Sequence, residues 1–164
     1  MSRAPDRPEF RFPVRVYYED TDASGVTYHA NYLRWFERGR TEWLRALGIG
    51  QEGLRDGTGA VFTVASLQID FRRPARLDDA LDVVTMVAAV RRASLLFEQT
   101  LVRSADGELL ARAAVKVGCV SHGDFRPIPL PEALEQAIEA WRKRDGDVLR
   151  GSPFQSRDEP EGWV

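Results

Sequence analysis

The chain has 164 residues, of which 43% are hydrophobic and 29% are charged, and its formal net charge at pH 7 is −2. These values are typical of one soluble globular domain and give no general attraction to nucleic acid or to anionic membranes. The longest apolar run, residues 83–90, is far shorter than the ~20 residues that a helix needs to cross a bilayer, and the N-terminus lacks the apolar region of a secretory signal.

A strand and a buried helix are predicted at the start of the chain. Residues 1–10 are polar and contain proline, so we expect a flexible arm in front of a domain over residues 11–144. Residues 13–20 are rich in β-branched and aromatic side chains, which favours a strand. Over residues 31–47, apolar side chains that include Leu33 recur at helical spacing on one face. A stripe this dense indicates a helix that is buried on more than one side.

Four long strands and a second helix are predicted after a glycine-rich linker that extends to Gly59. Apolar and polar residues alternate with period two after this linker, and Asp106 and Gly107 give a hairpin signal. The strands are predicted at residues 61–71, 81–90, 94–103 and 108–121, the helix at residues 130–144, and a flexible tail at residues 145–164. This order predicts an α+β domain in which a curved five-stranded antiparallel sheet wraps a long central helix.

The sequence DTDASG, which starts at Asp20, is similar to the start of an EF-hand calcium loop. The twelfth position, where an EF-hand needs a bidentate Glu, falls on Asn31, and the preceding segment is predicted as a strand instead of a helix. A His/Cys metal centre is also not expected, because His29 and His122 are the only histidines and Cys119 is the only cysteine. We therefore predict no metal, no cofactor and no internal disulfide, and the cysteine count fits a reducing cytoplasm.

Other catalytic or cofactor patterns in the chain are rejected for similar reasons. Residues 48–53 spell G-x-G-x-x-G, but they follow a predicted helix, whereas a dinucleotide site must follow a strand. No G-x-S-x-G motif occurs, and Ser24 has no evident base. Cys119 alternates with Ala113 and Val117 on one strand face, so we expect it in the core instead of as a nucleophile.

The DTDASG segment can also be interpreted as an active site in front of a helix. If the helix begins near Asn31, its free N–H groups and positive dipole end suit a carbonyl oxygen that becomes an oxyanion. A carboxylate in the loop could activate water or attack directly, and Gly25 would permit a sharp turn or a close approach of substrate. The competing interpretation is an Asx-turn that only connects strand to helix. The residues alone leave both open and do not specify a reaction.

Residues 14–45, VRVYYEDTDASGVTYHANYLRWFERGRTEWLR, carry a resemblance to a known family. They resemble the signature of hotdog-fold acyl-CoA thioesterases, most closely the group associated with the Tol–Pal cell-envelope system and akin to 4-hydroxybenzoyl-CoA thioesterase. The similarity covers residues 12–130, and its most specific part is Asp-Thr-Asp followed by Gly and then Tyr-His-Ala-Asn-Tyr. It implies a long helix wrapped by an antiparallel sheet, and hydrolysis of acyl-CoA to a free acid and coenzyme A.

The resemblance also implies roles for individual residues. Asp22 matches the catalytic carboxylate, as nucleophile or as general base. The backbone N–H of His29 matches the group that polarises the thioester carbonyl, and its side chain is included in the site. Asp20 is expected to brace the loop. The positions that are expected to bind substrate, or to shape the loop around it, are Gly25, Tyr28, Asn31 and Arg76.

Arginines near predicted strand ends are candidates for the phosphates of coenzyme A, because guanidinium groups suit phosphate oxygens geometrically. These residues are Arg72, Arg73, Arg76, Arg91 and Arg92, with Arg76 the first choice. They could equally meet an acidic acyl carrier protein, and a solvated strand end is the structural alternative. One turn apart on the predicted helix, Glu37 and Arg40 are expected to form an ion pair instead of a catalytic group.

The resemblance further implies acyl-CoA as the substrate, with an acyl carrier protein thioester as the alternative. It implies a homodimer or homotetramer whose site lies between protomers. Two rival functions stay open. One is a hydratase or dehydratase of acyl thioesters in the same fold. The other is a non-catalytic module that binds acyl-CoA or acyl carrier protein, although a pure binder has no need for Asp22, Gly25 and His29 together.

Overall fold

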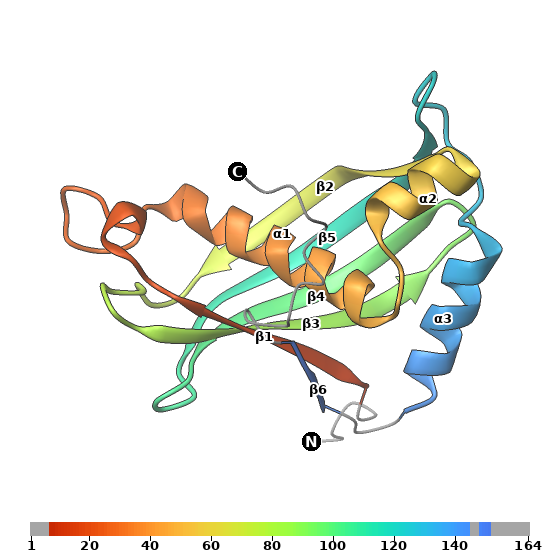
Figure 1. Ribbon diagram of the computed structural model, residues 1–164. Helices are drawn as coiled ribbons and strands as arrows, with labels where there is room; N and C mark the ends of the chain where they lie inside the picture. Colours follow the sequence, from red (N-terminus) through yellow and green to blue (C-terminus); the bar gives the residue numbers. More distant parts are fainter. Residues whose placement is uncertain (1–6, 145–147, 152–164) are drawn as a thin grey trace, which may run out of the picture.

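The structure is a computed structural model that describes residues 7–144 and 148–151 (Figure 1). Its strands are β1 (Glu9–Arg15), β2 (Ala60–Phe71), β3 (Ala80–Val90), β4 (Ser94–Arg103), β5 (Leu109–Ser121) and β6 (Val148–Arg150). Its helices are the 3-10 helix η1 (Tyr18–Asp20) and the α-helices α1 (His29–Ala46), α2 (Gln51–Thr58) and α3 (Glu132–Arg142). None of the described helices is long and apolar enough to span a membrane.

One curved sheet wraps α1, and the strand order is β2-β5-β4-β3-β1-β6 (Figure 1). The β2–β5, β5–β4, β4–β3 and β3–β1 pairs are antiparallel, whereas β1 and β6 are parallel. Along β5, buried and exposed residues alternate from Ala111 to Cys119, as expected for a strand with one face on the core. The predicted α+β architecture is confirmed, with six strands in the sheet instead of five.

The central helix α1 is buried against the concave face of the sheet. Trp35 and Trp43 are each 1% exposed, and Gly39 lets the helix approach β3 closely. A Cβ at Gly39 would lie 2.6 Å from Cγ1 of Val83, which is too close for any side chain. Leu33, which the helical pattern assigned to the buried face, is 40% exposed instead.

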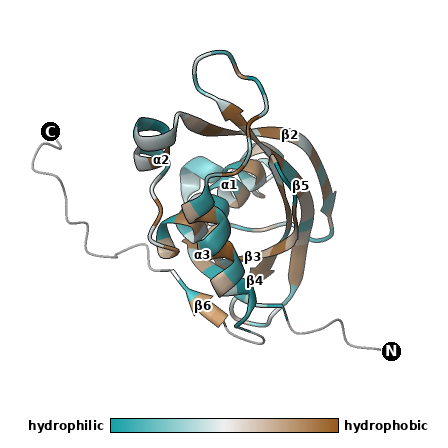
Figure 2. Cartoon of the chain, turned by 90° about the vertical axis from the view of Figure 1, so that its right-hand side faces the viewer, coloured by the Kyte–Doolittle hydropathy of each residue, from teal (hydrophilic) through white to brown (hydrophobic). Residues whose placement is uncertain are grey.

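The far end of α1 is closed by α3. The Trp43 ring packs edge-to-face on Phe97 of β4 and Trp141 of α3, with centroids 5.3 and 5.6 Å away. Figure 2 shows α1 enclosed by the strands, with hydrophobic segments on the strands and hydrophilic segments along α3. The helix predicted over residues 130–144 is therefore confirmed, with one apolar face on the core.

Several boundaries differ from the sequence prediction. The strand predicted over residues 13–20 ends at Arg15, and Tyr18–Asp20 form the 3-10 helix η1 instead. The expected linker after α1 contains α2, in which only Leu54 is buried; so little apolar content gives a weak periodic signal. Phe10, placed in the arm, is fully buried in β1, and Val148–Arg150, placed in the tail, pairs with β1. Strand β6 was missed because it pairs through backbone hydrogen bonds, which the side-chain pattern does not report. The remainder of the expected arm and tail (1–6, 145–147 and 152–164) lies outside the described residues.

Strand β2 forms one edge of the sheet and exposes apolar side chains. Its period-two pattern is confirmed as a strand, but the register shifts at a bulge between Val64 and Ser66. Val64, Leu67 and Phe71 are 48%, 40% and 52% exposed. Edge strands with several exposed apolar side chains are unusual unless another chain covers them.

Candidate active site

The DTDASG motif folds as a tight loop between β1 and α1, at the left of Figure 1. The Asp22 N–H donates to the Val26 carbonyl oxygen at 3.0 Å, and the Gly25 N–H donates to the Asp22 carbonyl oxygen at 3.0 Å. Gly25 has a φ of 81°, in the left-handed region that glycine adopts without strain. The expected sharp turn at Gly25 is confirmed, and the chain then enters α1 at His29.

Asp20 braces this loop through both carboxylate oxygens. Its Oδ2 accepts from the Tyr17 N–H at 2.8 Å, and its Oδ1 accepts from Nδ2 of Asn31 at 2.8 Å. Its carbonyl oxygen accepts from the Tyr28 N–H at 2.8 Å. Because Asn31 is only 6% exposed, its bond ties the loop to a buried position of α1. The bracing role of Asp20 is confirmed, and Asn31 uses its amide to shape the loop.

Asp22 is exposed and has a different environment. Its Oδ1 accepts from the Ser24 hydroxyl and from the Ser24 N–H, the latter at 2.8 Å. The hydroxyl, then the N–H, and to a smaller extent the nearby His29 hold the pKa of the Asp22 carboxyl below its ordinary value. The group is therefore ionised at neutral pH. Within the described residues Oδ2 accepts no hydrogen bond, so one oxygen is available for chemistry.

Ser24 is the residue of this loop whose contribution the sequence interpretation missed. Its bonds to Asp22 form the Asx-turn that was considered as a purely connecting element. The structure shows that the two bonds that make the turn also stabilise the ionised form of Asp22. The D-x-S spacing is the sequence signal that indicates it.

Helix α1 begins at His29 without a side-chain cap. Tyr28, the residue before it, makes no side-chain hydrogen bond to the helix, and the first turn has no acidic residue. The described residues offer no acceptor for the His29 backbone N–H, as is usual at a helix N-terminus. The exposed His29 ring lies 4.7 Å from the Tyr28 ring and 6.5 Å from the Phe71 ring, centroid to centroid. This N–H and the positive end of the helix dipole can polarise a carbonyl oxygen brought to them.

Arg76 lies beside the same loop. Val26 and Arg76 form an antiparallel bridge, and the Thr27 N–H donates to the Ala75 carbonyl oxygen at 2.9 Å. The Arg76 residue is exposed. The fold thus brings an arginine 54 positions further along the chain to the end of the molecule that carries Asp22.

The other candidate arginines do not form one group. Arg72 and Arg73 follow β2 at the same end as Arg76, where Arg73 pairs with Glu108 at 3.4 Å. Arg91 and Arg92 lie in the turn between β3 and β4, at the opposite end of the strands (Figure 1). Within one chain the five arginines therefore form two separate groups, and only Arg72 and Arg73 lie near Arg76.

Tyr32 is a second residue that the sequence interpretation missed. It lies one turn after His29, is 3% exposed, and its hydroxyl oxygen accepts from the Ala75 N–H at 2.9 Å. Its ring also packs edge-to-face on Phe71 at 5.2 Å. Burial, and to a smaller extent Asp79, raises the pKa of the Tyr32 phenol despite the Ala75 bond. Its signal in the sequence was its position on the buried stripe of α1.

Glu37 and Arg40 do not form the predicted ion pair. Glu37 accepts from the Thr41 hydroxyl at 2.7 Å, and Arg40 donates to Oε1 of Gln99 at 3.0 Å. Burial lowers the pKa of Arg40, with Glu37 acting in the opposite sense. The ion pair of Glu37 with Arg40 is absent because the Arg40 side chain turns toward the sheet and binds the buried Gln99.

An apolar cavity of about 160 Å³ lies beside this second half of α1. It lies between α1 and strands β2, β4 and β5. Its lining consists of Glu37, Arg40, Thr41, Trp43, Leu44, Gln51, Phe62, Val64, Leu95, Phe97 and Val117. None of the loop residues from Asp20 to His29 belongs to this lining. Within one chain, the cavity and the Asp22 loop are separate features.

The chain matches known proteins over most of its length. Residues 16–138 match the model of the thioesterase-like superfamily. The chain is 49% identical over 129 residues to acyl-CoA thioesterase YbgC of Haemophilus influenzae, which covers 79% of this chain and 93% of that protein. It is 44% identical over 125 residues to acyl-CoA thioester hydrolase YbgC of Escherichia coli, with 76% and 92% covered.

A solved structure gives the same result. A probable thioesterase from Bartonella henselae is 36% identical, has a TM-score of 0.70, and matches 74% of this chain and 98% of that one. The hotdog fold expected from the resemblance is confirmed by this agreement. With the family model covering most of the chain and relatives this similar, the chain belongs to the thioesterase-like superfamily.

Proposed function

We propose that this protein is an acyl-CoA thioesterase, which hydrolyses acyl-CoA to a free acid and coenzyme A. The observation that carries the proposal is the exposed, ionised Asp22 carboxylate in the loop that leads into the uncapped N-terminus of α1 at His29. A thioester carbonyl is more electrophilic than that of an ester. One carboxylate and one oxyanion donor can therefore suffice.

In the proposed reaction, the thioester carbonyl oxygen accepts the His29 backbone N–H. If Asp22 is the general base, its carboxylate takes a proton from water while the water oxygen bonds to the carbonyl carbon. The C–S bond then breaks, and the thiolate takes the proton back. If Asp22 is the nucleophile, its carboxylate forms an anhydride as the thiolate leaves, and water then cleaves the anhydride. Both routes consume one water and restore Asp22.

Arg76 is proposed to contact the phosphates of coenzyme A. It is exposed, lies in the segment bridged to Val26, and has no ion-pair partner among the described residues. A guanidinium group suits phosphate oxygens because its N–H groups can bind two oxygens at once. Gly25, Tyr28 and Asn31 are proposed to shape the loop on which the substrate lies.

A second copy of the chain is proposed to complete the site. The exposed apolar residues of β2 would be buried by antiparallel pairing of two β2 edges around a twofold axis. In such pairing, Phe71 at the end of one β2 would lie beside the first residues of the other β2. Phe71 lies next to His29, and the first half of β2 lines the apolar cavity. The acyl group bound at Asp22 would then enter the cavity of the other protomer. A dimer of dimers is compatible with this arrangement.

The test of the oligomer is light scattering on a Leu67→Lys variant, with Lys143→Gln, on an exposed side chain after α3, as the control. We expect a dimer or tetramer for the wild type and the control, and smaller particles with reduced activity for Leu67→Lys. A monomeric wild type with full activity would contradict the proposal. The single cysteine further supports the proposed location in the reducing cytoplasm.

The test of the function is thiol release from a panel of acyl-CoA substrates and the corresponding acyl carrier protein thioesters. We expect release by the wild type and almost none by Asp22→Ala. Release that is undiminished in Asp22→Ala would overturn the catalytic assignment. Binding without thiol release would favour the acyl-thioester binding module. Substrate consumption at constant free thiol would favour the hydratase or dehydratase.

A further inference from the structure

The segment Ala75–Asp79, called here the arginine turn, is held on several sides by backbone hydrogen bonds. Ala75 donates its N–H to the Tyr32 hydroxyl and accepts the Thr27 N–H, both at 2.9 Å. On the other side, the Asp78 N–H donates to the Val16 carbonyl oxygen at 2.9 Å. The Val16 N–H in turn donates to the Asp79 carbonyl oxygen at 3.0 Å. The arginine turn is thus fixed to the end of β1, the Asp22 loop and the first turns of α1.

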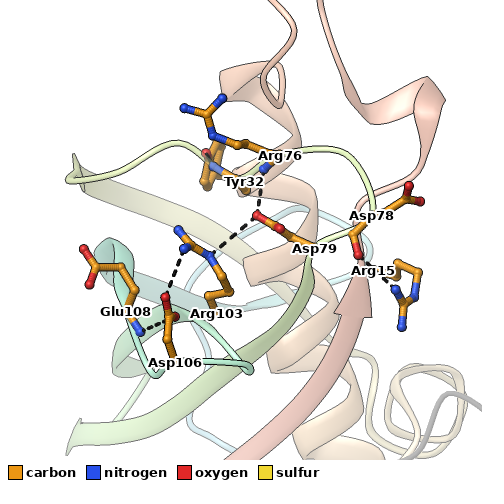
Figure 3. Close-up of polar contacts among 9 residues, drawn as sticks. Arg15, Tyr32, Arg76, Asp78, Asp79, Arg103, Asp106 and Glu108 are labelled. Carbon is orange, nitrogen blue, oxygen red and sulfur yellow. Dashed lines mark hydrogen bonds and ion pairs between the residues drawn. The ribbon is translucent and has the colours of Figure 1, made fainter.

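Asp79 makes the one side-chain contact that fixes Arg76 within this turn. Its Oδ2 accepts from the Arg76 backbone N–H at 3.0 Å, and its own N–H donates to the Arg76 carbonyl oxygen at 3.1 Å. Figure 3 shows the Arg76 guanidinium pointing away from the Asp79 carboxylate. The carboxylate therefore holds the backbone of Arg76 and leaves its charged group free.

Arg103, at the end of β4, balances the charge of Asp79. Its Nε lies 3.7 Å from Asp79 Oδ2, an ion pair too long for a hydrogen bond, and its Nη1 lies 3.1 Å from Asp106 Oδ2 (Figure 3). The side chains of Arg103 and Asp79 are only 27% and 22% exposed, so the charges are incompletely screened. Without Arg103, the Asp79 carboxylate would have no cationic side chain beside it and would attract the Arg76 guanidinium.

We infer that Asp79 and Arg103 are positioning residues that present the guanidinium of Arg76 to the phosphates of coenzyme A. Asp79 acts through its hydrogen bond to the Arg76 backbone, and Arg103 acts by preventing Asp79 from capturing the Arg76 side chain. This inference rests on the proposed function for its ligand, but it concerns binding of the phosphates and not cleavage of the thioester.

The test measures binding and catalysis separately on the full chain. Dissociation constants for coenzyme A and for pantetheine, which lacks the phosphates and the adenosine of coenzyme A, are measured by titration calorimetry. KM and kcat are measured with acyl-CoA and the matching acyl-pantetheine. The variants are Asp79→Ala, Asp79→Asn, Arg103→Gln and Arg76→Ala. Lys143→Gln, on a 75% exposed side chain, controls for loss of one positive charge.

We expect Asp79→Ala to weaken coenzyme A binding about fivefold or more. The variant loses the hydrogen bond from the Arg76 backbone N–H to the Asp79 carboxylate, which fixes the Arg76 backbone. Asp79→Asn keeps an oxygen acceptor for the Arg76 N–H and removes a negative charge, so binding should equal or exceed that of the wild type. Arg103→Gln should weaken binding about threefold by leaving Asp79 unbalanced. Pantetheine binding and kcat should stay unchanged in these three variants, as should every constant of Lys143→Gln.

In the Arg76→Ala background, Asp79→Ala should have no further effect on coenzyme A binding, because both act through one group. Equal losses for Asp79→Ala and Asp79→Asn, or equal losses for coenzyme A and pantetheine, would overturn the inference and indicate a general structural role. If Asp79→Ala does not fold, Arg103→Gln and Asp79→Asn still give opposite predictions. The expected binding pattern without thiol release would support the inference while refuting the proposed function.

Discussion

The loop in front of α1 and the second half of this helix are held in place by different forces. At its N-terminal end, the loop from Asp20 to His29 is mostly exposed and is fixed by hydrogen bonds to identified polar groups. In its second half, Gly39 and Trp43 are buried against β3, β4 and α3, and packing dominates. The first region can carry chemistry because its polar groups remain accessible to substrate. The second supplies the rigid support on which that loop depends.

If the loop carries the chemistry and the second half of α1 carries the stability, substitution of Asp22 should have the largest effect on activity and almost none on stability. We expect Asp22→Asn to lower kcat by about 10²- to 10⁴-fold, the usual contribution of a positioned acid–base group. Its melting temperature should stay close to that of the wild type, because the Asp22 side chain is exposed. Thiol-release kinetics and thermal denaturation measure the two quantities. A large drop in the melting temperature of Asp22→Asn would contradict the separate roles of the loop and the packed helix.

Gly39→Ala is expected to have the opposite effect, with a loss of stability as the primary change. Its Cβ would lie 2.6 Å from Val83 Cγ1 and 3.0 Å from Thr85 Oγ1, so the helix must move away from the sheet. We expect a loss of about 1–3 kcal/mol in the free energy of unfolding, as is typical of overpacked cores. Urea denaturation measures it. As the matched control, the same change at Gly53, where a Cβ meets nothing within 4 Å, should not destabilise the protein.

Asp20→Ala is expected to lower both the stability and the activity of the protein. It leaves the buried amide of Asn31 without its acceptor, which costs about 1–3 kcal/mol for an unsatisfied buried polar group. Activity should fall as well, because the loop that carries Asp22 loses its brace. Asp20→Asn, which keeps an acceptor oxygen, should recover part of both losses. Unfolding and kcat measurements that showed only one of the two losses would contradict the bracing role.

A smaller effect is expected on the pH dependence of activity. Ser24 lowers the pKa of Asp22, so the active carboxylate is present above that pKa and is lost as the pH falls through it. Ser24→Ala should raise the pKa toward the ordinary value of ~3.9 and move the acid limb of kcat/KM to higher pH. Carbon NMR titration of Asp22 provides the direct measurement. An unchanged or lowered pKa would refute the assigned role of Ser24.

Removal of divalent cations is expected to have no effect on activity. The carboxylates of Asp20 and Asp22 are engaged with different partners, although calcium binding would require them to converge on one ion. Thiol release after EDTA treatment should equal that of the untreated protein. A loss that calcium restores would reinstate the EF-hand interpretation.

The accuracy of the sequence prediction follows the strength of the periodic signal. The central helix and the four long strands were predicted because their apolar residues recur with a period of 3.6 or 2. This holds for β2 as well, although most of its residues are exposed in one chain. Helix α2 was missed because only Leu54 in it is buried. Strand β6 was missed because three residues that pair through their backbone leave no such pattern.

The candidate site divides in the same way. The motif placed Asp20, Asp22, Gly25, His29 and Asn31 together because they are close in the sequence. The D-x-S signal for the bonds of Ser24 to Asp22 was overlooked, and the spacing gave no indication that Asp20 binds Asn31. Those contacts depend on the conformation of the turn, which several residue patterns can adopt.

The sequence by itself determined the α+β class, the buried helix and the loop motif at its start, since these depend on local patterns of apolar and polar residues. Only the tertiary structure decided which distant groups meet. It separated Arg76 from Arg91 and Arg92, joined Ala75 to Tyr32, and set Arg103 beside Asp79. The physical reason is that strand pairing and helix packing fix these contacts, and they leave no periodic trace in the residues that make them.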